Sequence, residues 1–451
     1  MENLLDKIVS FAKRRGFIFP SSEIYGGLAN TYDYGPLGVE LKNSIKNIWW
    51  KKFVQQRDDM VGIDAALIMN TEVWKASGHL KEFYDSLLQC KKCNSIFRED
   101  EISGLPIDPS SPSKIEEIKN FLKDLTCPNS KCNQKGNFTL PTLFNLMFET
   151  NLGPVKNEKS KVYFRPETAQ AMFVDFKQVL DTNPRLRLPF GIAQIGKAFR
   201  NEITPGNFIF RTREFEQMEI EYFVKEEEWG KWFEYWRKEM WDWIINGLGL
   251  DKNHIHELEV PDSERAHYSK RTIDFEYDFP FGRKELYGLA YRGDFDLKNH
   301  YKKAPYKDPD SGEEFYFHVI EPTWGVDRSF LAILCDSYRE EKERVVLKLK
   351  PHLAPYKAAI FPLLANKPEL LKLARKIYDD LRQNFMVAFD DRGNIGKRYY
   401  SQDEIGTPYC ITVDFESLEK DDVTIRDRDT MLQERVKIKD LIKILEKKLN
   451  S

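Results

Sequence analysis

The 451-residue sequence predicts an α+β protein with two parts: an antiparallel-sheet domain over residues 1–350 and a smaller α/β domain over residues 351–451. The sheet is predicted from residues 217–222, where polar and apolar side chains alternate with the period of a half-buried strand. Residues 192–200 are also β-like, and residues 204–207 have the composition of a turn, so the two segments should pair antiparallel. The α/β domain is predicted because helix-like and strand-like segments alternate beyond residue 350.

The composition is that of a globular protein with a sizeable core. Hydrophobic residues make up 41% and charged residues 31%, and the sequence has no run of about 18 apolar residues, so no membrane span is expected. The first residues lack a basic stretch followed by an apolar one, and we therefore expect a cytoplasmic location. The net charge of −3 neither indicates nor excludes nucleic-acid binding, because a local basic patch is what contacts phosphate.

The first part opens with two helix-like segments. Residues 2–15 have apolar side chains at helical spacing, and a longer pattern begins at Pro36, which suits the first turn of a helix. The longer segment has one apolar face and is predicted to be a core helix. The residues of this face are Leu41, Ile45, Ile48, Trp49 and Phe53.

Two cysteine pairs follow, Cys90 with Cys93 and Cys127 with Cys132. Together they can supply four thiolates to a tetrahedral zinc ion. The first pair has the spacing of a zinc knuckle, whereas the second pair is more widely spaced, so four reduced thiols in a charged insertion are the alternative. A helix is predicted over residues 115–125, between the two pairs.

Three more segments complete the first part. A helix is predicted over residues 169–179, directly before the paired strands. Residues 225–250 carry five tryptophans at helical spacings, a stripe that indicates core packing. A helix is predicted over residues 326–338, and Gly325 before it would let the backbone approach a ligand.

The second part reads as a succession of short elements. Its pattern predicts helices over residues 370–383, 395–404 and 440–449, and strands over residues 385–389, 409–415, 423–426 and 435–438.

Charged side chains gather at the loop ends of the predicted strand pair. Its arginines can bind anionic oxygens as planar forks, and its glutamates can hold amines, hydroxyls or a metal ion. The alternative is a surface hairpin crossed by salt bridges. The residues are Arg200, Arg211, Arg213, Glu202, Glu214 and Glu216.

The segment 199–223, with Phe-Arg-Asn-Glu before the loop and Arg-Glu-Phe-Glu-Gln-Met-Glu after it, resembles motif 2 of the class II aminoacyl-tRNA synthetases. More narrowly, it is similar to the homodimeric glycyl-tRNA synthetases, and the likeness covers nearly the whole chain. It implies a homodimer in which the helix from Pro36 contributes an intermolecular face. It also implies motif 1 at about residues 33–60, a cysteine-containing insertion at about 80–140, motif 2 at 199–223, a second insertion at about 225–284 and motif 3 at 321–340.

The resemblance implies a ligase that activates glycine with ATP and Mg²⁺ and transfers it to tRNA(Gly). Arg200 would bridge the α-phosphate and the glycine carboxylate, and Arg211 would hold the γ-phosphate. Phe215 and Arg328 would enclose the adenine, whose amino group would meet Glu202. The catalytic residues implied are Arg200 and Arg328, and Glu285 is the candidate Mg²⁺ carboxylate. The implied ATP site is Arg200, Asn201, Glu202, Phe210, Arg211, Thr212, Arg213, Glu214, Phe215, Glu285, Leu286, Gly325, Val326, Asp327 and Arg328.

The resemblance also implies a glycine pocket in which four glutamates, Glu167, Glu216, Glu219 and Glu321, surround the ammonium group. Every competing amino acid is larger than glycine, so steric rejection suffices and no editing site is demanded. Thr323 stands where the family pattern has serine, and its extra methyl group would narrow the pocket. The implied glycine site is Arg98, Glu167, Phe215, Glu216, Gln217, Met218, Glu219, Arg292, Glu321, Thr323 and Gly325.

The second part resembles the anticodon-binding domain of the same family. There Lys397, Arg398, Tyr399 and Arg426 combine cations with a ring, a mixture that suits single-stranded RNA. A synthetase for threonine, proline or histidine is one alternative, against which the glutamate-rich motifs argue. A non-catalytic RNA-binding paralogue is another, against which the retained ATP-site residues argue.

Overall fold

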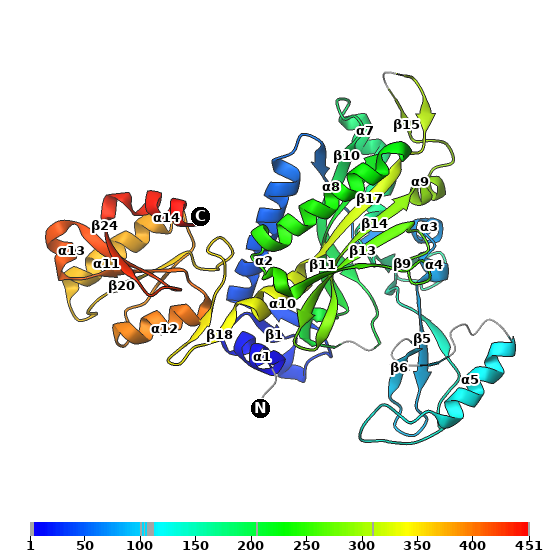
Figure 1. Ribbon diagram of the computed structural model, residues 1–451, viewed down its shortest axis with the longest axis horizontal. Coiled ribbons are helices and arrows are strands. Elements are labelled where there is room, and N and C mark those ends of the chain that lie inside the picture. Colours follow the sequence, from blue (N-terminus) through cyan, green and yellow to red (C-terminus); the bar gives the residue numbers. More distant parts are fainter. Residues whose placement is uncertain are drawn as a thin grey trace.

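The structure is a computed structural model that describes residues 4–99, 102, 104–105, 112–203, 206–308 and 311–449. Its largest sheet has seven strands among these residues and lies at the centre of the first part (Figure 1). All neighbouring strands are antiparallel except β10 and β3, which confirms the α+β prediction. In spatial order the strands are β12 (Ile255–Glu259), β13 (Arg271–Phe279), β14 (Gly282–Gly293), β17 (His318–Gly325), β11 (Glu214–Val224), β10 (Phe190–Phe199) and β3 (Met60–Gly62).

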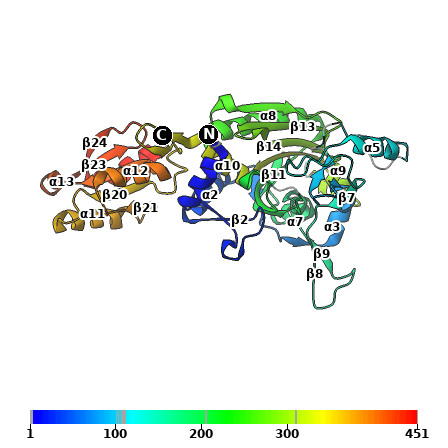
Figure 2. The ribbon, with the colours of Figure 1, turned by 90° about the horizontal axis from the view of Figure 1, so that it is seen from below.

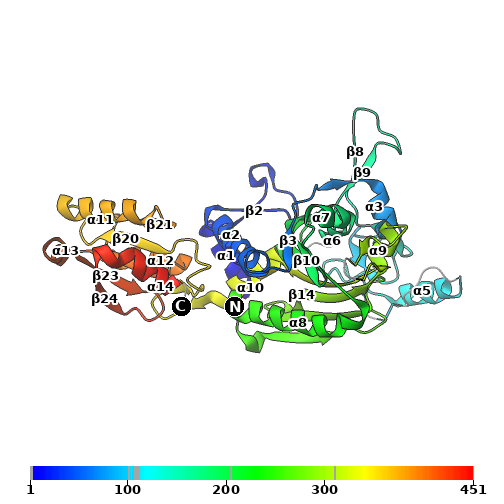
Figure 3. The same ribbon diagram turned by 90° about the horizontal axis from the view of Figure 1, so that it is seen from above.

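Helices cover both faces of this sheet, and Figures 2 and 3 show α7 and α8 on opposite sides of it. The larger core joins one face to α2, α8 and α10. Trp236 of α8 is buried in it, and the other tryptophans of this helix, Trp229, Trp232 and Trp241, are half-buried against it. A second core joins the other face to α6, α7 and α9. The helices are α1 (Leu4–Arg14), α2 (Pro36–Trp50), α6 (Ala169–Val174), α7 (Phe176–Thr182), α8 (Trp229–Asp242), α9 (Phe295–His300) and α10 (Val326–Ser337).

Strand β11 is buried on both faces, so the prediction of a half-buried strand was wrong. Met218 and Ile220 lie in the larger core, as their spacing indicated. Glu219 and Glu221 on the other face are also buried, because α6 packs over that side of the sheet. The polar side of β11 is therefore an interior site and not a solvated surface. Two residues of the predicted turn, 204 and 205, lie outside the described residues.

Helix α2 starts at Pro36 as predicted, but its apolar face is not intermolecular. Leu41, Ile45 and Trp49 are fully buried within the chain's own core. The Trp49 ring lies 5.3 Å from the ring of Trp324 on β17. This face anchors the helix to the central sheet, so a dimer contact would have to use other surfaces.

The cysteine-containing insertion forms a small unit that projects from the first part (Figure 1). It has its own core, a three-stranded sheet and the predicted helix. These elements are β5 (Tyr84–Gln89), β6 (Ile96–Arg98), β7 (Thr142–Asn145) and α5 (Pro112–Asp124). The remaining short elements are α3 (Thr71–Ala76), α4 (His79–Glu82), β1 (Ile18–Pro20), β2 (Tyr32–Tyr34), β4 (Ile68–Met69), β8 (Glu149–Asn151), β9 (Lys161–Phe164), β15 (Tyr306–Lys307), β16 (Glu314–Phe315), β18 (Tyr338–Glu340) and β19 (Val345–Leu347).

Two predicted helices differ in detail. The helix expected over residues 169–179 is two helices, α6 and α7, which meet at Asp175. The helix expected to reach Tyr338 ends one residue earlier, because Tyr338 begins β18 and pairs with Leu347. No helix in the described ranges is long and apolar enough to cross a membrane.

The second part is an α/β unit with a mixed five-stranded sheet in the order β21, β20, β22, β23, β24. Strand β20 and helix α13 had no counterpart in the sequence prediction. Phe415, predicted as the end of a strand, begins α13, because the Asp414 side chain accepts a hydrogen bond from the Ser417 N–H and caps the helix. The elements are β20 (Ala358–Pro362), α11 (Pro368–Leu381), β21 (Val387–Phe389), α12 (Ile395–Ile405), β22 (Tyr409–Val413), α13 (Phe415–Lys420), β23 (Asp422–Asp427), β24 (Gln433–Lys437) and α14 (Leu441–Leu449).

A buried ionic network joins the two parts. Asp403 of α12 is fully buried and accepts two hydrogen bonds from Arg426 of β23, at 2.8 and 2.9 Å. Arg344, between β18 and β19, donates to the same carboxylate at 2.6 Å and to the carbonyl oxygen of Arg428 at 2.8 Å. Arg344 of the first part and Asp403 and Arg426 of the second part thus form one buried ionic cluster.

Candidate active site

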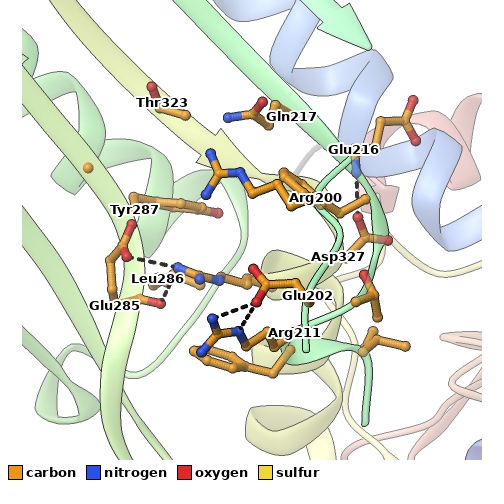
Figure 4. A pocket seen from close by; sticks show the side chains of 17 residues that line it. Arg200, Glu202, Arg211, Glu216, Gln217, Glu285, Leu286, Tyr287, Thr323 and Asp327 are labelled. Atoms are coloured by element: carbon orange, nitrogen blue, oxygen red, sulfur yellow. Dashed lines mark hydrogen bonds and ion pairs between the residues drawn. The ribbon is translucent and has the colours of Figure 1, made fainter. Parts of the chain in front are cut away.

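A cavity of about 140 Å³ lies at the ends of β10, β11, β14 and β17 (Figure 4). Most of the residues implied for ATP line it. Arg200 and Glu202 follow β10, Glu285 belongs to β14, and Arg328 belongs to the first turn of α10. The lining is Arg200, Glu202, Ile209, Phe210, Arg211, Thr212, Phe215, Glu216, Gln217, Glu285, Leu286, Tyr287, Gly288, Thr323, Gly325, Asp327 and Arg328.

Aromatic rings hold Arg200 at the edge of this cavity. Its guanidinium carbon lies 5.3 Å from the ring centres of both Phe83 and Phe215, and its Nε donates to the carbonyl oxygen of Pro166 at 3.1 Å. Figure 4 shows the guanidinium group pointing into the cavity. These contacts orient the Arg200 guanidinium group toward the cavity.

The other two arginines of the cavity are paired with glutamates. Arg211 donates from Nε to Glu202 Oε2 at 2.7 Å, and Arg328 Nη1 lies 3.1 Å from Glu285 Oε2. The Arg328 guanidinium lies 4.5 Å from the ring centre of Phe210 and not over Phe215. Phe215 and Arg328 line the same cavity, and their enclosure of adenine stays a prediction.

Four residues implied for ATP do not line the cavity. Arg213 donates to the carbonyl oxygens of Ala29 and Glu202, and Glu214 forms an ion pair with Lys197. Val326 is buried in the core, and the Asn201 N–H donates to the carbonyl oxygen of Leu146. These residues support the cavity from outside, and contact with ATP stays a prediction for them.

A further carboxylate, Asp274 on β13, lies beside the cavity and was not predicted from the sequence. A methyl group at Gly288 would lie 3.9 Å from an oxygen of Asp274 and 3.9 Å from an oxygen of Glu285. Burial, together with the nearby Glu285 and Glu276 carboxylates, raises the pKa of Asp274 to about 7, against the opposing effect of Arg328. Two carboxylates held this way fit the ligand preference of Mg²⁺. No motif marked Asp274; only its position in an alternating strand next to β14 could have identified it.

A second cavity, of about 310 Å³, adjoins the first and is lined with carboxylates. Glu167, Glu219, Glu321 and Thr323 line it, and Arg200 lines both cavities. Thr323 Oγ1 lies 2.9 Å from Glu219 Oε1 and 3.2 Å from Glu321 Oε1. The threonine hydroxyl thus fixes two of the carboxylates implied for glycine.

The carboxylates of the second cavity experience opposite electrostatic effects. Burial raises the pKa of Glu219 and raises that of Glu321 to about 8, although Arg292 opposes the shift at Glu321. Burial acts in the same direction on Glu167, but the neighbouring His79, with Arg292 and Gln170, outweighs it and holds the pKa well below its usual range. One anionic carboxylate therefore sits beside two that resist ionisation, an arrangement that favours a cationic ligand.

Six residues implied for the glycine pocket do not line the carboxylate cavity. Phe215 and Gly325 line the first cavity instead, and Arg292 is buried. The other three are Glu216, Met218 and Arg98. Glu216 and Met218 are on the opposite face of β11 from Glu219, because side chains alternate along a strand. Glu216 is held by Lys42 and Lys46 of α2, each at 3.0 Å, and Figure 4 shows it directed toward that helix. Arg98 belongs to the insertion and is paired with Asp85 at 2.9 Å. These residues do not join the carboxylate cavity in this structure.

Arg292 is fully buried and orders one wall of the carboxylate cavity. Its Nε and Nη2 donate to Asp296 of α9 at 2.7 and 2.9 Å, and its Nη1 donates to Glu321. The sequence analysis did not identify Asp296, His79 or Gln170, which hold Arg292 and Glu167 in place. Asp296 and Gln170 follow Arg292 and Glu167 by four and three residues, a spacing that could have indicated them, whereas His79 is far from Glu167 in the sequence.

The four cysteines converge as predicted. Sγ–Sγ distances are 3.9 Å for Cys90 and Cys132 and 3.8 Å for Cys93 and Cys127, and all four sulfur atoms lie within 4.8 Å of one another. A tetrahedral zinc ion with bonds of about 2.3 Å needs sulfur atoms roughly 3.8 Å apart. The geometry therefore fits zinc ligation.

The structure corrects the prediction for the second part. Arg398 is buried and donates from Nε, Nη1 and Nη2 to the carbonyl oxygens of Arg392, Pro362 and Gly393. Arg426 is buried against Asp403. Both guanidinium groups are occupied inside the domain and do not face RNA. Lys397 is exposed, and contact with RNA stays a prediction for it and for the half-buried Tyr399.

Comparison with known proteins agrees with this geometry. Residues 148–338 match a tRNA synthetase class II core domain (G, H, P, S and T), and residues 357–448 match an anticodon binding domain. A glycine–tRNA ligase of Caldanaerobacter subterraneus is 52% identical over 99% of this chain and 98% of its own length. Those of Clostridium acetobutylicum and Geobacillus thermodenitrificans are 51% and 49% identical, over 99% and 100% of this chain and 99% and 98% of their own lengths. These full-length relatives do not favour the threonine, proline, histidine or non-catalytic alternatives. The chain belongs to the glycine–tRNA ligase family of class II synthetases.

Proposed function

We propose that the chain joins glycine to ATP, releasing pyrophosphate, and then transfers glycine from the adenylate to the 3′ end of tRNA(Gly), releasing AMP. The observation that carries the proposal is that Arg200 lines both an arginine-rich cavity and a carboxylate-rich cavity. The first suits the phosphates of ATP and the second suits an ammonium group. The activity belongs in the cytoplasm, where the tRNA substrate is used.

Arg200 is the residue best placed to stabilise the first step. The glycine carboxylate attacks the α-phosphorus while the bond to pyrophosphate breaks, so negative charge passes through the boundary between the two cavities. A guanidinium group fixed there by two aromatic rings is aimed at that charge before the reaction begins. Arg211 and Arg328 are ion-paired with glutamates, so ATP would compete with Glu202 and Glu285 for them.

Mg²⁺ would be held by Glu285 and Asp274, and when bound it would neutralise phosphate charge. The two carboxylates approach the space above Gly288, beside the first cavity. The chain's own contribution is to hold these groups on two paired strands, β13 and β14, where their separation is fixed by the sheet.

Glycine would be recognised by its ammonium group and by the absence of a side chain. Glu167, Glu219 and Glu321 supply the negative environment, and Thr323 orients two of them. The threonine hydroxyl is committed to these carboxylates, so its methyl group adds bulk to the pocket wall. Larger amino acids would be rejected by contact with this wall.

Zinc would hold the insertion together through Cys90, Cys93, Cys127 and Cys132. Asn129 Nδ2 lies 3.8 Å from Cys93 Sγ, so the Cys93 thiolate would accept a hydrogen bond from this amide in addition to binding the metal. Metal analysis should find about one zinc per chain, and Cys90→Ser should lower it. A protein without metal and with unchanged stability would favour the alternative of four reduced thiols.

A second copy of the chain is the partner we propose for an exposed apolar loop. Ile24 and Tyr25 are each 87% exposed and Leu28 is 62% exposed. Figure 3 shows this loop, between β1 and β2, on the same side of the molecule as the β8–β9 hairpin, which exposes Leu152 and Val155. Exposed apolar clusters favour contact with another protein surface. Sedimentation velocity should report a dimer, and Ile24→Asp should weaken it; a monomer at all concentrations would exclude this contact.

The test of the activity is ATP–pyrophosphate exchange measured across the amino acids. Glycine should support exchange, and alanine and serine should hardly do so, because both carry a Cβ atom that glycine lacks. Equal exchange with threonine or proline would contradict the proposed specificity. Aminoacylation of tRNA(Gly) transcripts then tests the transfer step.

A further inference from the structure

Glu221 is a buried carboxyl group directly beneath the carboxylate cavity. It is 0% exposed and follows Glu219 by two residues on the same face of β11. Strand pairing sets Glu219 opposite Thr323 and Tyr222 opposite Ile320 on β17, which places Glu221 opposite Glu321. An oxygen from each of the three glutamates lies within 4.8 Å of the others. Like charges directly opposite each other in a sheet are unfavourable.

Glu221 has none of the hydrogen bonds that its two glutamate neighbours make. Neither of its oxygens accepts or donates a hydrogen bond to the part of the chain that the structure describes. Glu219 is bonded to Thr168 and Thr323, and Glu321 to Arg292 and Thr323. On β10, the residue paired with Glu221 is the apolar Ile192. A buried carboxylate without a partner is strongly disfavoured, and the group takes up a proton instead.

The charges around Glu221 also favour its protonated form. The groups that face it are Glu219 on its own strand, Glu321 on β17, Arg292 on β14 and Asp296 on α9. Arg292, the one cation of this set, is engaged by Asp296 and Glu321. Burial, followed by the Glu321 charge, holds the pKa of Glu221 well above its usual range.

We propose that the Glu219–Glu221–Glu321 cluster holds a proton on Glu221 when the pocket is empty, and that entry of the substrate's ammonium group expels this proton to solvent. The inference rests on the proposed function, in which the ammonium group sits beside Glu219 and Glu321. Its positive charge replaces the positive charge of the proton, so the net charge of the site is conserved. The bond that breaks is the O–H bond of Glu221, and no other group is oxidised, reduced or transferred. Glu221 is a positioning residue, because it acts on the ammonium group through Glu219 and Glu321.

The consequence is a proton-coupled affinity. A protonated Glu221 removes one negative charge from beside Glu219 and Glu321, which lowers the electrostatic repulsion among the buried carboxylates. If one proton leaves per ligand bound, the affinity should rise by about tenfold per pH unit while Glu221 is protonated in the empty site. A ligand that lacks the ammonium group should show no such dependence.

Calorimetry with glycylsulfamoyl-adenosine, a stable analogue of the adenylate, tests the proposal. The observed binding enthalpy should vary with the ionisation enthalpy of the buffer, and the slope should correspond to release of nearly one proton at about pH 7. Sulfamoyl-adenosine, which fills the ATP cavity without an ammonium group, is the matched ligand control and should release none. Glu221→Gln replaces the carboxyl group with a neutral amide of the same shape, and it should abolish the release and flatten the pH dependence of Kd.

Each outcome decides the question. No proton release by the wild-type protein, or full release by Glu221→Gln, would overturn the proposal. If the variant does not fold, infrared difference spectra of the wild-type protein can follow the C=O band of a protonated carboxyl group, which should disappear when the glycyl analogue binds. A protein that neither binds this analogue nor exchanges glycine refutes the proposed function itself. One that does both without proton release refutes only the coupling.

Discussion

The arginines of the active-site cavity and those of the C-terminal domain have similar sequence surroundings but opposite structural roles. Arg200 is flanked by aromatic rings and points into a cavity (Figure 4). Arg398 donates hydrogen bonds from three nitrogen atoms to carbonyl oxygens, and Arg426 donates from two nitrogen atoms to Asp403. A cation near an aromatic ring is therefore no evidence of a ligand site by itself. What distinguishes the two regions is whether the guanidinium group faces a cavity or completes the bonding of its own domain.

The largest expected effect is loss of activation in Arg200→Ala. Removing a donor aimed at charge in the transition state costs roughly 10²–10³ in kcat. Glycine-dependent exchange should fall by that factor, while the thermal unfolding midpoint stays close to the wild-type value because the side chain is only half-buried. Full exchange activity in Arg200→Ala would remove the distinction between the two regions.

Arg426→Ala should act on stability instead of catalysis. It leaves Asp403 fully buried with Arg344 as its remaining cation, and breaking a buried pair in this way costs about 3 kcal/mol. Denaturant unfolding should show the loss, whereas exchange without tRNA should persist under native conditions. The partly exposed Arg435 of β24, which also pairs with carboxylates, is the matched control, and Arg435→Ala should cost much less. Equal costs for the two variants would show that burial is not the deciding factor.

Thr323→Ser tests the wall of the carboxylate cavity. The hydroxyl that bridges Glu219 and Glu321 is retained, and only the methyl group is lost. Discrimination against alanine should relax by about tenfold, the lower end of what one methylene contributes. The ratio of kcat/KM for glycine and alanine measures this. An unchanged ratio would mean that the methyl group does not meet the substrate.

Lys397→Ala should give the smallest effect. Lys397 is exposed on α12, next to the buried Arg398. If Lys397 contacts a phosphate, its removal should weaken tRNA binding by several-fold. It should also reduce the slope of the logarithm of the binding constant against the logarithm of the salt concentration by about one. Exchange without tRNA should not change. Lys443, an exposed lysine on α14, is the control; the same change in both variants would indicate a general charge effect.

Much of the fold was predictable because it depends on local patterns. Pro36 predicted the start of α2, and the alternation around Glu219 predicted β11. The tryptophan spacing predicted that α8 packs against the core. Strand β20 was missed because its run Ala358–Pro362 is short and ends in proline. Helix α13 was missed because the capping bonds between Asp414 and Ser417 decide it, and these compete with a β-like run that ends at Phe415.

The site was predictable where motif residues belong to one strand pair, as with Arg200 and Arg211. Glu216 shows that the motif had to be combined with strand geometry, because an even-numbered residue of β11 cannot share a face with Glu219. The burial of Arg398 depends on Pro362, 36 residues earlier, and no local pattern reveals such a contact. Asp274 and Glu221 carry no motif at all, and only the assembled sheet shows what surrounds them.

The ionic network around Asp403 sets how force passes through the molecule. Arg344 approaches Asp403 from the first part, and Arg428 of the second part donates to the carbonyl oxygen of Leu349. A movement of one part relative to the other would leave the buried Asp403 carboxylate without its Arg344 partner. The junction between the two parts therefore resists such movement. The same bonds hold the C-terminal domain at one orientation to the active-site cavity, so a substrate that contacts both must span a fixed distance.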